Sequence, residues 1–315
     1  MSRGNTGAAV AAAASALLVA VTLSGCGLLG RDAEGVPGGG GGPAVTSASP
    51  SPSAGAATGT APAPTPSAAP TGDSTATPAP TPTAEVPPLA GRTVVIDPGH
   101  NPGNAAHPAE IAEQVDVGTG HKECDTVGAE DAAGNPEYAF TLDLARLVRE
   151  ELRERGADVV LTHDGDRPWG PCVDERARIG NEAGADAAVS LHADGGPATG
   201  RGFHVIAPGP VDAGTADNQK VVAPSRELAE RLREAFGAAT GMPVADYLAG
   251  GSGLDVRSDL GGLNLSQVPK VFLECGNMRN AEDAAALADP KWRRRAAAGV
   301  ADALTAFLTT DRPGS

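Results

Sequence analysis

Hydrophobic and polar positions follow a regular order only in the C-terminal two thirds of the chain. The run Val94-Val95-Ile96 is stopped by Pro98 and Gly99, which is typical of a buried strand that ends in a turn. Residues 137–155 repeat apolar side chains at i, i+3 and i+4 spacing, which predicts an amphipathic helix. Further strands are predicted at residues 158–162, 187–191, 202–207 and 270–273, and further helices at residues 174–183, 225–236 and 290–309.

The alternation of strands and helices indicates the α/β class. We expect a single domain over residues 90–312. Its sheet is expected to be twisted and mostly parallel or mixed, with about six strands and helices on both faces.

The first 26 residues have the pattern of an export signal. Arg3 precedes an uncharged run rich in Ala, Val and Leu, which ends at Leu23-Ser24-Gly25-Cys26. This ending resembles a bacterial lipoprotein signal, in which the cysteine becomes the new N-terminus and carries the lipid. An ordinary signal peptide and a transmembrane anchor are the alternatives. We expect an exported chain, lipid-anchored through Cys26 to the outer face of the cytoplasmic membrane, in the cell-wall space.

Residues 27–88 have a different composition, rich in Pro, Ala, Thr and Gly. Between Gly35 and Ala84 they hold a single charge, Asp73. Without apolar periodicity such a segment cannot offset the entropy of ordering its backbone, so we expect a disordered linker. Its prolines favour extended spans, which would let an anchored domain act at a distance from the membrane.

The charge of the chain excludes one class of partner. The net charge is −15, and the residues after Leu89 carry −13 of it. Binding to nucleic acid depends on Lys and Arg that neutralise phosphates, so we expect no nucleic-acid partner. Membrane contact is expected through the lipid anchor only, and the chain is expected to be a monomer.

Four polar residues are candidates for a catalytic or metal-binding site. His100, His192 and Glu274 each come directly after an apolar strand, where open α/β sheets place their ligand sites, and Glu137 opens the first long helix. Two imidazoles and a carboxylate can hold Zn²⁺, and a further carboxylate can act as a base. The spacing matches no short zinc motif. A carboxylate also suits a helix start by itself, so the residues alone leave the metal site open.

Four segments resemble a known family. They are Val94 to His100, Asn135-Pro136-Glu137, Ser190 to Asp194 and Phe272 to Gly276. In order and spacing they resemble the zinc-dependent N-acetylmuramoyl-L-alanine amidases of the type 3 class, and most closely the actinobacterial cell-wall amidases. The resemblance covers about residues 92–310.

The resemblance implies a hydrolase that acts on peptidoglycan or muropeptides. It implies that His100, Glu137 and His192 bind Zn²⁺, with Glu130 as the competitor of Glu137, and that Glu274 is the catalytic carboxylate. The bond cleaved would be the amide between the lactyl group of N-acetylmuramic acid and L-alanine of the stem peptide. The alternatives are a zinc peptidase that cuts within the stem peptide and a catalytically silent peptidoglycan-binding lipoprotein. The intact ligand set and Glu274 argue against the silent form.

The chain departs from the family pattern after Glu274, where Arg279 stands and the usual aromatic residue is absent. This departure leaves the substrate contacts at the rim open. Asn277 and Arg257 are predicted to contact substrate, and Arg279 is predicted to face solvent. Arg257 lies in the glycine-rich segment 250–262, which is expected to be a mobile loop beside the substrate.

The remaining cysteines and histidines receive simpler assignments. If Cys26 carries lipid, three cysteines remain. Cys124 and Cys172 both lie in loops beside the expected site and are predicted to form a disulfide, whereas Cys275 is predicted to be a buried free thiol. The other histidines are assigned no role in the site; they are His107, His121, His163 and His204.

Overall fold

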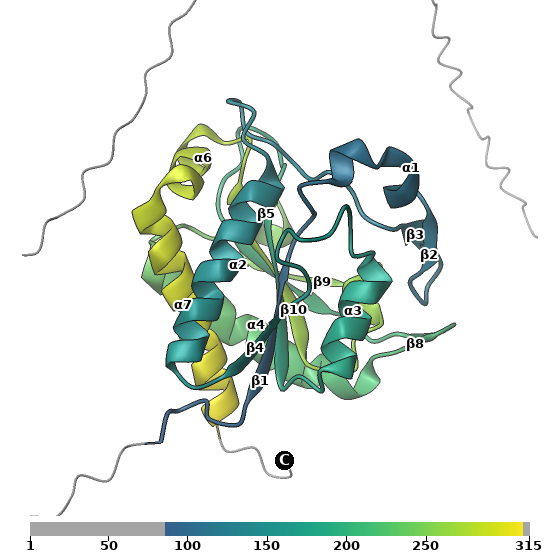
Figure 1. The fold of residues 1–315 in the computed structure, drawn as a ribbon. Coiled ribbons are helices and arrows are strands. Elements are labelled where there is room, and N and C mark those ends of the chain that lie inside the picture. Colours follow the sequence, from purple (N-terminus) through teal and green to yellow (C-terminus); the bar gives the residue numbers. More distant parts are fainter. Residues whose placement is uncertain (1–85, 311–315) are drawn as a thin grey trace, which may run out of the picture. The chain divides into compact units, whose positions relative to one another are not determined.

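A six-stranded mixed sheet is the centre of the computed structural model, which describes residues 86–310 (Figure 1). The strands run in the order β4-β1-β5-β10-β6-β9. Their bounds are β1 Thr93–Pro98, β4 Asp158–Leu161, β5 Ala187–Asp194, β6 His204–Pro208, β9 Leu254–Arg257 and β10 Lys270–Asn277. The first four strands in this order are parallel, and β6 and β9 run in the opposite direction. The predicted α/β class with a mixed sheet is therefore confirmed.

Three long helices form one layer against the sheet. They are α2 (Glu137–Glu154), α4 (Gln219–Thr240) and α7 (Pro290–Thr309), and α7 packs against both of the others. Figure 1 shows α2 and α7 side by side on one face, with α3 on the opposite side of the sheet. The main hydrophobic core lies between this layer and the sheet and includes Leu144, Phe236 and Phe307, none of which is exposed. Burial of their apolar surface is the main stabilising term of this face.

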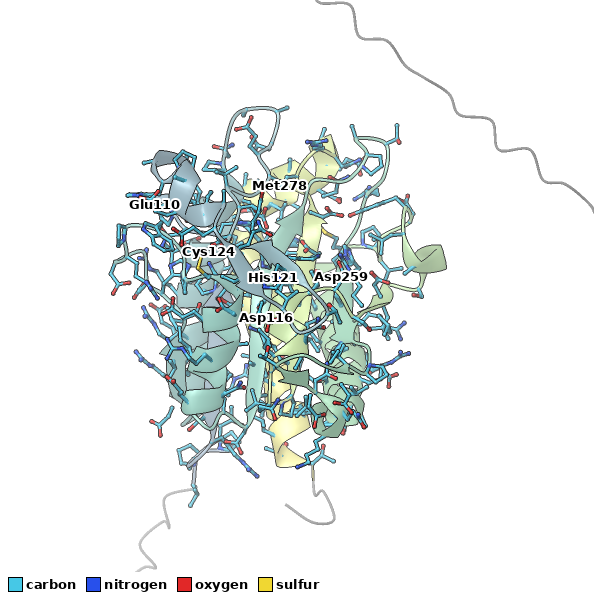
Figure 2. All side chains as sticks on the ribbon, turned by 90° about the vertical axis from the view of Figure 1, so that its right-hand side faces the viewer. Glu110, Asp116, His121, Cys124, Asp259 and Met278 are labelled. Carbon is cyan, nitrogen blue, oxygen red and sulfur yellow. A yellow bond between two sulfur atoms is a disulfide. The ribbon has the colours of Figure 1, made fainter. Side chains whose placement is uncertain are left out.

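The opposite face carries smaller elements. Helix α3 (Val173–Glu182) packs against α5 (Gly261–Asn264) and near a hairpin formed by β2 (Gln114–Asp116) and β3 (His121–Glu123). The remaining elements are α1 (Pro108–Ile111), α6 (Ala281–Ala288), the strands β7 (Asp212–Ala213) and β8 (Ala216–Asp217), and two short 3₁₀ helices, Asn104–Ala106 and Ala249–Gly251. Figure 2 shows the hairpin in front of the sheet, with Asp116 and His121 on it and Asp259 close by.

Two segments differ from the prediction. Helix α4 begins at Gln219 rather than at residue 225, because Pro224 is accommodated inside the helix instead of preceding it. A proline there removes only one backbone hydrogen bond near the helix start. The expectation of a mobile loop at residues 250–262 was wrong. The segment contains β9, whose backbone pairs with β6 at the sheet edge, and the short helix α5. The glycines on either side of β9 are typical of a loop, so the sequence pattern did not indicate this strand.

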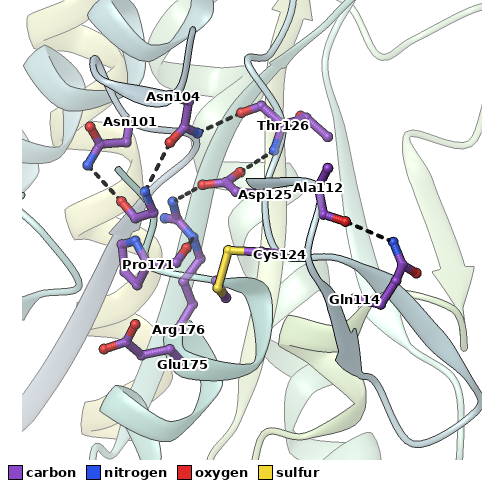
Figure 3. Close-up of a disulfide and its surroundings, with 12 residues drawn as sticks. Asn101, Asn104, Ala112, Gln114, Cys124, Asp125, Thr126, Pro171, Glu175 and Arg176 are labelled. Carbon is purple, nitrogen blue, oxygen red and sulfur yellow. Dashed lines mark hydrogen bonds and ion pairs between the residues drawn. A yellow bond between two sulfur atoms is a disulfide. The ribbon is translucent and has the colours of Figure 1, made fainter. Parts of the chain in front are cut away.

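The cysteines are arranged as predicted where the structure describes them. Cys124 and Cys172 form a disulfide across 48 residues, and Cys275 is a buried free thiol. The disulfide joins the end of the hairpin segment to the residue before α3, so it ties the smaller elements to the domain (Figure 3). Cys26 lies outside the described residues. Among residues 86–310, no helix is long and apolar enough to cross a membrane.

Replacing Cys124 and Cys172 with serine should lower the free energy of unfolding by about 2–4 kcal/mol, because an unfolded chain without the cross-link gains loop-closure entropy. Equilibrium denaturation in guanidinium chloride measures this change. Cys275→Ser in the oxidised protein is the control for the effect of removing a thiol. An unfolding free energy that is unchanged in the double variant would contradict the prediction.

Candidate metal centre

Three side chains from three separate elements meet at the C-terminal edge of the parallel strands. His100 follows β1, Glu137 is the first residue of α2, and His192 lies in β5. His100 Nε2 is 3.1 Å from Glu137 Oε2, and His192 Nδ1 is 3.0 Å from Glu137 Oε1. One ligand atom from each residue lies within 4.8 Å of the others. The structure therefore brings together the three residues that were predicted as metal ligands, and Glu130 is exposed and outside this group.

The local backbone permits this close approach. His100 adopts a left-handed conformation with φ of 63°, which is unusual for a residue with a Cβ and is typical of functional sites. A Cβ at Gly99 would lie 2.4 Å from the His192 ring, and a Cβ at Gly128 would lie 2.7 Å from the His100 ring. Glycine is needed at both positions so that the two imidazoles can approach each other.

Hydrogen bonds from the main chain orient the ligand atoms. His100 Nδ1 lies 3.0 Å from the carbonyl oxygen of Thr126. Because a carbonyl only accepts, Nδ1 carries the hydrogen and Nε2 is left as the metal-binding atom. The Glu137 carboxylate accepts one hydrogen bond from the amide of Ala129 (2.8 Å) and one from the amide of Ala193 (3.0 Å). The main chain thus fixes the directions of the His100 ring and of the Glu137 carboxylate.

The electrostatics of the three residues also favour a cation. Burial alone would disfavour the charged form of His100, but the charges of Glu137 and Asp125 outweigh burial and raise the pKa of His100 to about 10. Burial would likewise raise the pKa of Glu137, but the neighbouring histidines hold it well below its usual range. The space between these side chains therefore favours positive charge. Two histidine nitrogens and one carboxylate match the ligand preferences of Zn²⁺ with a position left for water.

Glu274 stands beside this group without belonging to it. It lies on β10 directly opposite His192 on β5. A pocket of about 300 Å³ is lined by Glu274, Asp194 and the three candidate ligands. Glu274 Oε2 is buried and has no hydrogen-bond partner. Burial, and then the carboxylates of Glu137 and Asp194, raise the pKa of Glu274 well above its usual range. A carboxyl group with a raised pKa beside a metal site is suited to take up and release a proton.

A second cavity lies on the other side of the two histidines. Its volume is about 530 Å³, and it is lined by the hairpin on one side and by Val173, Leu260 and Phe272 on the other. The Phe272 ring stacks on the His192 ring at 5.1 Å. This cavity could not be predicted from the sequence, because the hairpin strands are only three residues long and have no apolar alternation.

A buried arginine holds the backbone that carries His100. Arg176 uses all five of its N–H groups in hydrogen bonds. Figure 3 shows the one to Asp125. The acceptors are Asp97 Oδ1, Asp125 Oδ2 and the carbonyl oxygens of Pro98, His100 and Pro171. No pattern along the chain indicates a role for this residue. Asp97 accepts hydrogen bonds from Arg176, Lys270, Thr162 and Ser190.

Three further residues near the site, Arg257, Arg279 and Asn277, differ from one another in exposure and in their partners. Arg257 lies on β9, is partly exposed and pairs with Asp259 at 2.7 Å. Arg279 is exposed, as predicted. Asn277 is fully buried. Its amide nitrogen donates to the carbonyl oxygens of Pro197 and Gly200, and its amide oxygen accepts from the Arg279 amide. Asn277 therefore holds a loop in place, and this internal role replaces the substrate contact that we predicted for it.

Comparison with known proteins identifies the family to which the chain belongs. The family model described as N-acetylmuramoyl-L-alanine amidase matches residues 94–306. The chain belongs to this family of amide hydrolases, and the resemblance found in its motifs is confirmed.

Individual relatives agree with the family. The chain is 41% identical over 223 residues to N-acetylmuramoyl-L-alanine amidase Rv3717 of Mycobacterium tuberculosis, with 70% of this chain and 88% of the relative covered. The crystal structure of the amidase Ami1 from Mycobacterium smegmatis matches with a TM-score of 0.64 and 41% identity, covering 70% of this chain and 98% of that one. The apo form of Ami1 from Mycobacterium abscessus matches with the same TM-score and 43% identity, covering 70% of this chain and all of that one.

Replacing Arg176 with methionine should destabilise the domain by about 3–5 kcal/mol, because the charges of Asp97 and Asp125 remain buried without their partner. The ionised carboxylates also make stability depend on pH. Arg176 lowers the pKa of both groups, although burial opposes this. Their contribution is therefore present above the ordinary carboxyl pKa of about 3.9 and is lost as the pH falls through the lower pKa of the folded state.

Denaturant unfolding at pH 7 and at acidic pH measures both effects. The loss of unfolding free energy as the pH falls below about 4 should be smaller in the Arg176→Met variant than in wild type. Arg178→Met, which removes an exposed arginine from the same helix, is the matched control and should be close to wild type. Equal stability of the two variants would contradict the role assigned to Arg176.

Proposed function

We propose that this chain is a zinc-dependent amidase that cleaves the amide between the lactyl group of N-acetylmuramic acid and L-alanine of the peptidoglycan stem peptide. One observation carries the proposal: the ligand atoms of His100, Glu137 and His192 converge within 4.8 Å beside the carboxyl group of Glu274. Membership in the amidase family and the names of the mycobacterial relatives support the same activity.

His100, Glu137 and His192 would hold the metal. When bound, Zn²⁺ polarises a carbonyl and lowers the pKa of a water molecule. The protein itself contributes the orientation of these side chains, since the Thr126 carbonyl and the amides of Ala129 and Ala193 fix them before any ligand arrives.

Glu274 carries the proton in this proposal. Its carboxylate accepts a proton from the attacking water and delivers it to the nitrogen of L-alanine, which then leaves as an amine. Burial raises the pKa of Glu274 above its ordinary value, which makes this carboxylate a better proton acceptor than an exposed one. Asp194 lines the same pocket and has an oxygen not used by Tyr247, so it offers negative charge near the departing amine.

The residues from 90 onward should release the peptide from muramyl dipeptide, leaving a free lactyl carboxylate and a free L-alanine amine. Mass spectrometry of the products identifies both ends. Addition of a chelator should abolish the reaction, and Zn²⁺ should restore it. Products cut between two amino acids would favour a peptidase instead, and full activity in the chelator would refute the metal dependence.

Glu274→Gln should lower kcat by about 10²–10⁴-fold, because the amide cannot accept the proton. Its zinc content should equal that of wild type, since Glu274 is outside the ligand group. Glu130→Gln is the matched control, because Glu130 is an exposed glutamate in the segment before α2. Retention of most of the activity in Glu274→Gln would show that another group carries the proton.

We also propose that Cys26 is lipidated and anchors the exported chain to the outer face of the cytoplasmic membrane. The support is the sequence Leu23-Ser24-Gly25-Cys26 after the apolar run. In the native host, Cys26→Ser should abolish metabolic labelling with a fatty acid and move the protein from the membrane fraction to the soluble fraction. Membrane association that survives this substitution would instead indicate an uncleaved anchor.

A further inference from the structure

Arg279 is an exposed arginine whose guanidinium group has no partner within residues 86–310. Only its main-chain amide donates a hydrogen bond, to Asn277 Oδ1 at 3.0 Å. Arg257, in contrast, uses Nε and Nη2 to bind both oxygens of Asp259. Arg279 therefore has all five of its side-chain N–H groups available for a ligand.

A glycine separates Arg279 from the pocket that contains Glu274. Gly195 lines this pocket together with Glu274 and the three candidate metal ligands. A Cβ at Gly195 would lie 3.1 Å from the Cβ of Ala129 and 3.8 Å from Nε of Arg279. Because glycine has no side chain, residue 195 leaves the way open between the pocket and the guanidinium group.

The backbone that carries Arg279 is fixed on both sides. The amide of Met278 donates to the carbonyl oxygen of Asp194 at 2.8 Å, which ties the loop to the end of β5. The side chain of Asn280 accepts hydrogen bonds from two amides in the first turn of α6. The fold therefore sets the position of Arg279, and its side chain is free to adjust to a ligand.

The pocket itself offers an anionic ligand no positively charged side chain. Among the described residues, those that line it include the carboxylates of Glu137, Asp194 and Glu274 but neither lysine nor arginine. Arg279 at the edge of the pocket supplies the missing positive charge. A guanidinium group can bind a carboxylate through two parallel hydrogen bonds, which makes this contact selective as well as attractive.

The peptide half of the substrate is expected on this side of the metal. In the proposed function Glu274 delivers a proton to the nitrogen of L-alanine, so the peptide leaves within the pocket that Glu274 lines. The residue after L-alanine in the stem is D-glutamate, which continues the stem through its γ-carboxyl group. Its α-carboxyl group is a branch only a few bonds from the cleaved amide, and it is either free or converted to a carboxamide.

We propose that Arg279 is a specificity-determining residue: its guanidinium group binds the α-carboxylate of the D-glutamate after L-alanine and so selects stem peptides in which this group is not amidated. The proposal rests on the proposed function, because it requires the peptide to lie on the Glu274 side of the metal. Arg279 takes no part in the proton transfer, so its contribution is to substrate binding.

Two substrates that differ by a single charge test this assignment. Both are muramyl dipeptides whose γ-carboxyl group is a methylamide; the α-carboxyl group is free in one and a carboxamide in the other. Wild type should cleave the free acid with a kcat/KM about tenfold higher, because a charge-assisted hydrogen bond is stronger than a neutral one. The difference should appear mainly in KM and should become smaller at high salt, which screens exposed charges.

Substitutions at Arg279 should remove this preference. Arg279→Met should lower kcat/KM on the free acid by about tenfold and leave the carboxamide within about twofold of wild type. Arg279→Lys should keep part of the preference, since an ammonium group retains the charge but not the fork of donors. Arg294→Met, at an exposed arginine on α7, is the matched control and should cleave both substrates as wild type does.

A binding measurement separates this inference from the proposed function. In zinc-loaded Glu274→Gln, calorimetry should show about tenfold tighter binding of the free acid than of the carboxamide. The double variant Glu274→Gln/Arg279→Met should bind the two equally. If wild type cleaves neither substrate, the proposed function fails, and this measurement alone decides the role of Arg279.

Two results would overturn the inference. One is equal affinity of Glu274→Gln for the free acid and the carboxamide. The other is a preference for the free acid that survives unchanged in a folded Arg279→Met variant.

Discussion

The buried guanidinium of Arg176 is the interaction on which the site depends. A buried charge is tolerated only when its lost hydration is replaced, and here every N–H of Arg176 has an acceptor within 3.1 Å. Three of those acceptors are backbone carbonyls from the turn that carries His100 and from the segment before α3. Arg176 and Lys270 face Asp97 and Asp125, so the interior beneath the candidate metal centre contains balanced charges. The left-handed backbone of His100 is held by this balanced cluster.

Two glutamates of the site have pKa values shifted in opposite directions, because their surroundings differ. Glu137 accepts two main-chain hydrogen bonds and faces two histidines, which stabilise its ionised form. Glu274 is only a short distance away, but one of its oxygens has no partner and its neighbours include two carboxylates, which stabilise its neutral form. Residues whose surroundings separate their pKa values in this way can take different roles, one as a ligand and one as a proton carrier.

The sequence predicted the parts of this site that depend on local pattern. Apolar runs before His100, His192 and Glu274 identified the C-terminal parts of β1, β5 and β10, although β5 and β10 continue past these residues. The parallel sheet brings those parts together. The parts that depend on distant contacts could not be predicted. Arg176 lies on a polar helix and is defined by acceptors more than 50 residues away. Asn277 was predicted to contact substrate because it comes shortly after Glu274 in the sequence. Tertiary packing buries Asn277 instead.

The position of β10 in the sheet links the completion of the fold to the completion of the site. This strand, which carries Glu274, lies in the interior of the sheet although it comes late in the chain. Until it is inserted, β5 and β6 each present an unpaired edge, and the three candidate metal ligands lack the neighbouring carboxyl group of Glu274. A chain that ends before Lys270 therefore lacks an interior strand of the sheet and the proposed catalytic residue Glu274 at the same time. The proposed amidase activity therefore requires that this last strand of the sheet be in place.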